Sequence, residues 1–295
     1  MLAGTAMRLA LAMSIGLSVD ESYAAVMGRR LSLSYFDHPP MAFWWTGIAT
    51  RLAASEGPIV VRLPFIAAFV LTTWLMYRLG ALLFGESAGL LAAFLLNASL
   101  FFSVAAGGWA LPDGPLLLFS VASAYCLARA SIDGLPAPAG AAPRGGRNAW
   151  WVGFGATAGL ALLSKYHGFF LLVGAALYLL SSRQRAAWMR RPGPYLAIAL
   201  ATAIFLPVVV WNSAHDWASF RFQGGRSWRR HRGKVLATHG GGCSCAWGPG
   251  PSSSSRWWQP WVVAGCLTGR RPGTSFCFRC SGKQWSERAN GRGSG

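Results

Sequence analysis

Long apolar stretches alternate with short polar breaks along the first 226 residues of this 295-residue chain. A helix needs about 20 residues to cross a hydrocarbon layer of about 30 Å. Four stretches come close to that length, at about 58–80, 87–106, 112–130 and 193–211. The pattern therefore predicts an all-α protein, a polytopic bundle of transmembrane helices.

Two more regions fit the same pattern less simply. Residues 149–181 are too long for one span and are interrupted near Ser164-Lys165, so we expect two short or tilted helices there. Residues 1–17 are apolar except for Arg8, and no small-residue cleavage site follows them, which favours a first transmembrane helix over a cleaved signal peptide. The prediction is about seven spans, with a long first loop at residues 18–57.

The amino-acid composition indicates a membrane protein, and it differs between residues 1–226 and the C-terminal tail. Hydrophobic residues make up 53% of the chain and charged residues 12%, about half the charged share of soluble domains. The net charge of +18 does not indicate nucleic acid, because residues 227–295 hold 11 of the 27 basic residues and a single acid, Glu287. We therefore divide the chain into a transmembrane domain, 1–226, and a basic low-complexity tail, 227–295.

The tail shows no sustained helix or strand period, and we expect it to be disordered. It resembles an out-of-frame reading of a GC-rich gene, which makes a frameshift near residue 227 our hypothesis. The alternative is a zinc knuckle from Cys243-x-Cys245 and Cys277-x2-Cys280, whose two pairs have different spacings and lie 31 residues apart.

Basic residues beside the spans predict the orientation of the chain. Arg129, Arg144 and Arg147 follow the fourth span, and Arg183, Arg185, Arg190 and Arg191 follow the sixth. If both loops are cytoplasmic, residues 18–57, 107–113, Lys165 and the segment after Trp211 share the opposite face. The polar residues expected to converge there are Asp20, Glu21, Arg29, Arg30, Asp37, His38, Asp113, Lys165, His215 and Asp216.

Asp37 and His38 occupy a stiff part of the first loop. Pro39-Pro40 fix the backbone that follows and disfavour helix at His38. The aromatic run Phe43-Trp44-Trp45 suits a helix lying among lipid headgroups. The loop could thus present charged groups to a lipid headgroup, although a merely solvated pair is the simpler alternative.

Five motifs occur in order along the chain and together match a known family. They are the DE and the DHPP of "SVDESYAAVMGRRLSLSYFDHPPMAFW", then "LPDGPLLLF", "LLSKYHGFFLL" and "WNSAHDWASFRFQ". Over roughly residues 8–226 the chain resembles bacterial membrane glycosyltransferases of the protein O-mannosyltransferase and lipid A aminoarabinose transferase superfamily. The resemblance implies the N-terminal part of a GT-C fold in the bacterial inner membrane, with the active site facing the periplasm or exterior. It also implies sugar transfer from a polyprenyl-phosphate carrier to an acceptor hydroxyl.

Such a transfer needs a base near the hydroxyl and positive charge near the departing phosphate. Asp20 or Glu21 can supply the base, and the resemblance favours Asp20, with inversion at the anomeric carbon. His38, Lys165 and the Arg29-Arg30 pair can contact the phosphate. Relatives often carry Lys where this chain has His38, and an imidazole is charged only when it is protonated.

Alternatives stay open for several of these residues. Asp20-Glu21 could simply cap a loop, Asp113 could cap the fourth span, and Lys165 could extend to the interface. His215 and Asp216 could bind a divalent cation with Asp37 and His38, although no tight ligand spacing supports this.

The predicted enzyme could be inactive as a truncated chain. The alternative function is a non-catalytic or transporter-like polytopic fragment; internal repeats, typical of transporters, are not evident. The sequence identifies neither the sugar nor the acceptor, which could be a lipid, a glycan or a protein.

Overall fold

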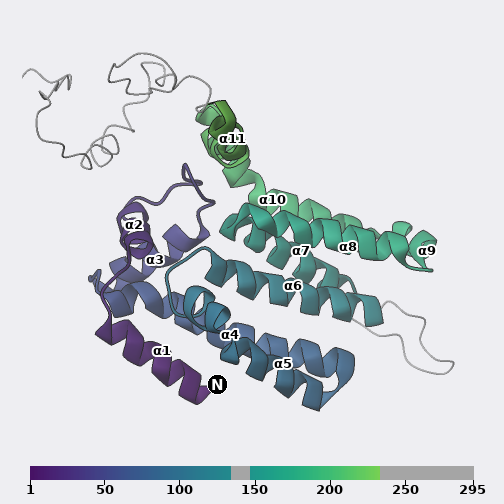
Figure 1. Ribbon diagram of the computed structural model, residues 1–295. Helices are drawn as coiled ribbons and strands as arrows, with labels where there is room; N and C mark the ends of the chain where they lie inside the picture. The colour runs from purple at the N-terminus through teal and green to yellow at the C-terminus, as the bar shows by residue number, and fades with distance from the viewer. Residues whose placement is uncertain (134–146, 233–295) are drawn as a thin grey trace, which may run out of the picture. The chain divides into compact units, whose positions relative to one another are not determined.

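The computed structural model describes residues 1–133 and 147–232, and within them every regular element is helical (Figure 1). The tail, its cysteines and Arg144 therefore lie outside the described residues, apart from the start of the tail. Helix α11 crosses the boundary predicted at residue 226, since it runs from Ala218 to Arg232. The elements are α1 (Leu2–Ser14), α2 (Val19–Gly28), α3 (Met41–Ala53), α4 (Pro58–Phe84), α5 (Glu86–Ala98), the π-helix η1 (Phe102–Ala106), α6 (Asp113–Asp133), α7 (Arg147–Ser164), the 3-10 turn η2 (Tyr166–Gly168), α8 (Phe169–Ser181), α9 (Arg185–Met189), α10 (Pro192–Ala214) and α11.

Fewer helices have the length of a full span than the sequence predicts. Among the described residues, three are long and apolar enough, namely α4, α6 and α10. A fourth is added if α1 and α2, which meet at 83°, count as one broken span. Helices α5 and α8 are apolar but have 13 residues each and extend only about 20 Å, so they are shorter than a full span.

One local feature shortens a predicted span. The stretch predicted as one span at 87–106 is divided at Ser99, where α5 ends in extended backbone before η1 begins. The first loop contains α2 and also α3, which includes the aromatic run Phe43-Trp44-Trp45. The break predicted at Ser164-Lys165 is confirmed, because α7 ends at Ser164 and Lys165 is extended.

Close helix packing depends on small residues. On α7, Gly155 lies against Ala197 of α10, and a Cβ there would come within 2.5 Å of the Ala197 carbonyl oxygen. Gly28 of α2 and Gly47 of α3 meet in the same way, and a Cβ on Gly28 would lie 2.8 Å from the Gly47 nitrogen. Such contacts are typical of membrane helices, where packing rather than water exclusion drives association.

The helix ends that carry the polar motifs meet at one end of the bundle. A buried cluster joins α2, α3 and α4 through Ala25, Ala42 and Phe65. A second cluster joins α3, α7 and α10 through Met41, Leu163 and Val208. The loop before α6, the end of α7 and the end of α10 are therefore brought near the two short helices of the first loop.

Candidate functional site

The start of α2 is fixed by a capping box. Ser18 is the N-cap residue, and its Oγ accepts a hydrogen bond from the Glu21 backbone nitrogen at 3.4 Å. In return, the Glu21 Oε2 accepts from the Ser18 backbone nitrogen at 2.9 Å. This reciprocal pair satisfies two amides that a helix start otherwise leaves unpaired.

Glu21 is also one half of a buried ion pair with Arg62 of α4. Arg62 donates from Nε to Oε1 and from Nη2 to Oε2, both at 2.7 Å, and the two side chains are 3% and 0% exposed. The backbone nitrogen of Ala110, in the loop before α6, adds a bond of 3.2 Å to Oε1. Both carboxylate oxygens are thereby occupied, and both are shielded from solvent.

Arg62 also binds carbonyl oxygens just after the end of α1. Its Nη1 donates to the Ile15 carbonyl oxygen and its Nη2 to that of Gly16, each at 2.8 Å. A cation at a helix C-terminus interacts favourably with the unpaired carbonyls and with the helix dipole. One ion pair therefore joins the end of α1, the start of α2 and the loop before α6 to helix α4.

Asp20, in contrast, is exposed. Neighbouring residues of a helix point about 100° apart, so the inward position of Glu21 turns Asp20 outward. Among the described residues, no hydrogen bond or ion pair is recorded for the Asp20 carboxylate. Of the two predicted bases, Asp20 has a free carboxylate and Glu21 does not.

Asp37 and His38 form a hydrogen-bonded pair that α2 supports. The His38 Nδ1 lies 2.9 Å from the Asp37 Oδ2, and the Tyr23 hydroxyl donates to the Asp37 Oδ1 at 2.8 Å. Burial raises the pKa of Asp37, but the hydrogen bonds from His38 and Tyr23 together with the charge on a protonated His38 outweigh it, so the pKa lies below its ordinary value. Asp37 is thus an anion that holds the imidazole of His38 in place.

Asp113 and Lys165, which were predicted to lie on the same face of the membrane, form an ion pair, although 52 positions separate them in the sequence. The Lys165 Nζ donates to the two Asp113 carboxylate oxygens at 2.9 and 3.1 Å, and both side chains are partly exposed. Asp113 is also the first residue of α6. The helix-start and site interpretations of Asp113 are therefore compatible.

Arg29 and Arg30 lie at the surface beyond α2. Arg29 makes a two-pronged ion pair with Glu56, with contacts of 2.7 and 2.6 Å, and the two side chains are 59% and 42% exposed. Arg30 is exposed, and its carbonyl oxygen accepts from the Tyr35 hydroxyl. An anionic ligand at Arg29 would have to compete with Glu56.

His215 lies in a tight turn after α10. Its ring stacks on Trp211 with centroids 4.1 Å apart, and its Nδ1 lies 2.7 Å from the Trp211 carbonyl oxygen. The next two residues, Asp216 and Trp217, have φ of 53° and 57°. This left-handed backbone costs a non-glycine residue about 1–2 kcal/mol.

The turn is connected to the Asp37 loop through α11. The Tyr166 and Ser219 hydroxyls are hydrogen-bonded, and the Gln223 amide donates to the Asp37 carbonyl oxygen. Phe36 and Phe222 add a ring contact with centroids 4.7 Å apart. Within the part of the chain that the structure describes, no hydrogen bond, ion pair or ring contact joins His215 to Asp37 or His38.

The predicted polar residues thus form several small groups. Among the described residues, no group of three or more His, Cys, Asp or Glu side chains could hold a metal ion. The divalent-cation alternative that combined His215 and Asp216 with Asp37 and His38 gains no support from this arrangement.

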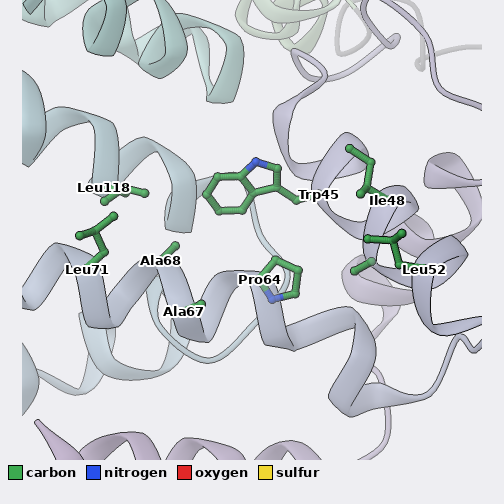
Figure 2. Close-up of a pocket in the computed structure, with 9 residues that line it drawn as sticks. Trp45, Ile48, Leu52, Pro64, Ala67, Ala68, Leu71 and Leu118 are labelled. Carbon is green, nitrogen blue, oxygen red and sulfur yellow. The ribbon is translucent and has the colours of Figure 1, made fainter. Parts of the chain in front are cut away.

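An apolar groove of about 420 Å³ lies among α3, α4 and α6. Figure 2 shows the Trp45 ring together with Pro64 and Ala68 of α4 and Leu118 of α6. The residues that line it are Trp45, Ile48, Ala49, Leu52, Pro64, Ala67, Ala68, Leu71 and Leu118.

Arg62 and Tyr23 were not among the predicted site residues. Arg62 interrupts an apolar helix, and an ionisable residue in such a helix usually has a buried partner, which was the available signal. The Ser18-x-x-Glu21 spacing was a second signal, because it is that of a capping box. Nothing in the sequence indicated that Tyr23 bonds Asp37.

The chain is a multi-pass helical membrane protein whose charged groups gather where helices end. Residues 37–211 match the sequence model of the family described as dolichyl-phosphate-mannose-protein mannosyltransferase. Because the match covers more than half of the chain, the chain belongs to this family, which confirms the resemblance drawn from the motifs.

Solved structures confirm the GT-C type of fold. ArnT from Cupriavidus metallidurans in the apo state matches with a TM-score of 0.57 and 20% identity. The same protein bound to undecaprenyl phosphate matches with a TM-score of 0.56 and 21% identity. Each match covers 75% of this chain and 42% of ArnT, so the chain spans less than half of ArnT. No curated protein sequence gave a significant match.

The ion pair generates a stability prediction. Arg62→Ala leaves the Glu21 carboxylate buried without its positive partner and should lower the free energy of unfolding by about 3–5 kcal/mol. Arg62→Lys should recover only part of this loss, because an ammonium cannot make the two parallel bonds. Thermal unfolding in detergent is the measurement, and Arg29→Ala, which breaks an exposed ion pair, is the control. Equal, small shifts for Arg62→Ala and Arg29→Ala would contradict the assignment.

The lowered pKa of Asp37 generates a pH prediction. A lowered pKa means that the favourable contacts of the carboxylate are present above its ordinary pKa and are lost as pH falls through the lowered value. Tyr23→Phe removes one donor, so the pKa of Asp37 should rise and protonation should occur at higher pH. Infrared spectra of the carboxyl C=O band between about pH 2 and pH 6, assigned with Asp37→Asn, would measure this. If the carboxyl band of Asp37 has the same pH midpoint in the parent and in Tyr23→Phe, the predicted effect of Tyr23 on the pKa of Asp37 is refuted.

Proposed function

We propose that this chain is part of a membrane glycosyltransferase that moves a sugar from a polyprenyl-phosphate donor to an acceptor hydroxyl. One structural observation carries the proposal: Asp20 has a free, exposed carboxylate beside Glu21, whose carboxylate is fully occupied. Family membership supports it, as does the fold shared with ArnT, whose structure includes undecaprenyl phosphate.

In the proposed reaction, Asp20 accepts the proton of the acceptor hydroxyl. The hydroxyl oxygen then bonds to the anomeric carbon while the bond from that carbon to the phosphate oxygen breaks. The polyprenyl phosphate leaves with that bonding electron pair, and the configuration of the anomeric carbon inverts. General-base help of this kind typically contributes about 10²–10⁴-fold.

The phosphate would interact with the basic side chains of Lys165 and His38. Lys165 has donor capacity beyond its two bonds to Asp113, and His38 can donate from its second ring nitrogen when it is protonated. Arg29 and Arg30 would contribute less directly, because Glu56 already neutralises Arg29. The polyprenyl chain would lie against the apolar groove beside Trp45.

Orientation is part of the same proposal. The arginines near the end of α6, between α6 and α7 and after α8 would face the cytoplasm. The polar helix ends would face the periplasm or exterior of a bacterial inner membrane. The acceptor, whether lipid, glycan or protein, would then approach from that side.

The experiment is a transfer assay with membranes that contain the 295-residue chain. Radiolabelled polyprenyl-phosphate sugars serve as donors, and release or transfer of the sugar is measured. Asp20→Asn should reduce turnover by at least about 10²-fold, equivalent to about 2.7 kcal/mol of barrier, because it removes the proton acceptor at nearly constant volume. Glu86→Gln, an exposed acid at the start of α5, is the control and should leave turnover unchanged.

Two results would contradict the proposal. Turnover of Asp20→Asn at the parent rate would remove Asp20 as the base. Absence of transfer by the parent with every donor tested would favour the non-catalytic alternative.

A further inference from the structure

The turn that follows α10 holds two adjacent non-glycine residues in the left-handed region, Asp216 and Trp217. Glycine would relieve the strain at either position, and neither position has it. Backbone strain of this kind persists only when the surroundings enforce it, and it tends to occur at functional sites.

Asn212 enforces this turn. Its side chain is fully buried, its carbonyl oxygen accepts from the Trp217 nitrogen at 2.8 Å, and its Oδ1 accepts from the Ser219 nitrogen at 3.1 Å. Phe220 stacks against Trp217 with centroids 5.9 Å apart and an angle of 23° between the rings. The indole is thus fixed on one side.

The strained turn exposes an aromatic side chain that directly follows two polar residues. Trp217 remains 45% exposed, and the side chains of His215 and Asp216 are exposed on the residues just before it. The His215 Nδ1 faces a carbonyl oxygen, which can only accept, so this nitrogen carries the proton and the neutral ring has Nε2 as an acceptor. An aromatic face, a carboxylate and an imidazole nitrogen therefore occur on three consecutive residues.

This combination matches the chemistry of a sugar ring. The electron-rich face of an indole attracts the polarised C–H groups on the apolar face of a pyranose, while a carboxylate and a ring nitrogen accept bonds from its hydroxyls. A tryptophan that only anchored the chain among lipid headgroups would need neither the strained backbone nor the two neighbouring acceptors.

The turn is also tied to the candidate site. Ser219 bonds Tyr166, and Gln223 bonds the backbone of Asp37 in the loop that carries His38. A sugar on Trp217 would therefore lie on the segment that holds this loop.

We propose that the His215-Asp216-Trp217 turn binds a sugar ring of the donor or the acceptor and contributes to sugar specificity. The inference rests on the proposed function, because it assigns a binding surface to that reaction. Trp217 supplies the stacking face, Asp216 the charged hydroxyl acceptor, and Asn212 holds both in position.

Saturation-transfer NMR on the detergent-solubilised full chain tests this without catalysis. The probes are methyl hexopyranosides and, as a headgroup analogue, glycerol 3-phosphate. The parent should transfer saturation to ring C–H protons of at least one sugar, and Trp217→Ala should weaken its affinity roughly tenfold. Trp217→Phe should retain most of the affinity, and Asp216→Asn, which tolerates the left-handed backbone, should weaken it while the protein stays folded.

Trp74→Ala is the matched control, because Trp74 of α4 is 44% exposed and lies outside the turn. The affinity of Trp74→Ala for the sugar should equal that of the parent. The inference is overturned if no sugar gives a signal, if Trp217→Ala and Trp74→Ala behave alike, or if Trp217→Ala removes only the glycerol 3-phosphate signal. Sugar binding without transfer would instead count against the proposed function alone, and Asp20-dependent transfer without a Trp217 effect would count against this inference alone.

Discussion

The buried pair between Glu21 and Arg62 is the interaction on which the candidate site depends. An ion pair shielded from water is tolerated only when its remaining hydrogen-bonding positions are satisfied. Here the backbone nitrogens of Ser18 and Ala110 donate to the Glu21 carboxylate. The carbonyl oxygens at the end of α1 accept from the Arg62 guanidinium. The 83° bend between α1 and α2 is the geometry in which both requirements are met.

Because of this ion pair, the adjacent acids Asp20 and Glu21 have different roles. Glu21 is a structural anion because its oxygens are occupied, and Asp20 is available because the helix turns it away from the same contacts. The second support of the site comes from the opposite end of the described chain. Gln223 and Phe222 of α11 hold the loop of Asp37, and Tyr23 of α2 holds its carboxylate. The loop that carries His38 is therefore fixed by residues about 14 and 186 positions away from Asp37.

The sequence predicted the features that depend on composition and local order. Apolar runs predicted a helical membrane bundle, and the Ser164-Lys165 interruption predicted the end of α7. Asp113 and Lys165 were expected on the same face because one span leads from each to the cytoplasmic loop between them, and they do form an ion pair. The motif order predicted the family correctly.

Features set by tertiary packing could not be predicted in the same way. The division of the 87–106 stretch at Ser99 follows from the fit of η1 against its neighbours, since Ser103 and Asn97 both bond the buried Arg8. The left-handed backbone at Asp216 and Trp217 has no glycine to reveal it. Arg62 was visible as a charge in an apolar helix, but 41 positions separate it from Glu21, and only the folded chain selects that acid as its partner.

The central claim is that the Glu21–Arg62 pair holds the segment that presents Asp20. Hydrogen exchange measured by mass spectrometry on the parent and on Arg62→Ala tests it most directly, because exchange reports local opening segment by segment. The account predicts faster exchange in Arg62→Ala across residues 12–24 and around Ala110, with little change in α7 and α10. Unchanged exchange in residues 12–24, or an equal increase throughout the described helices, would contradict it.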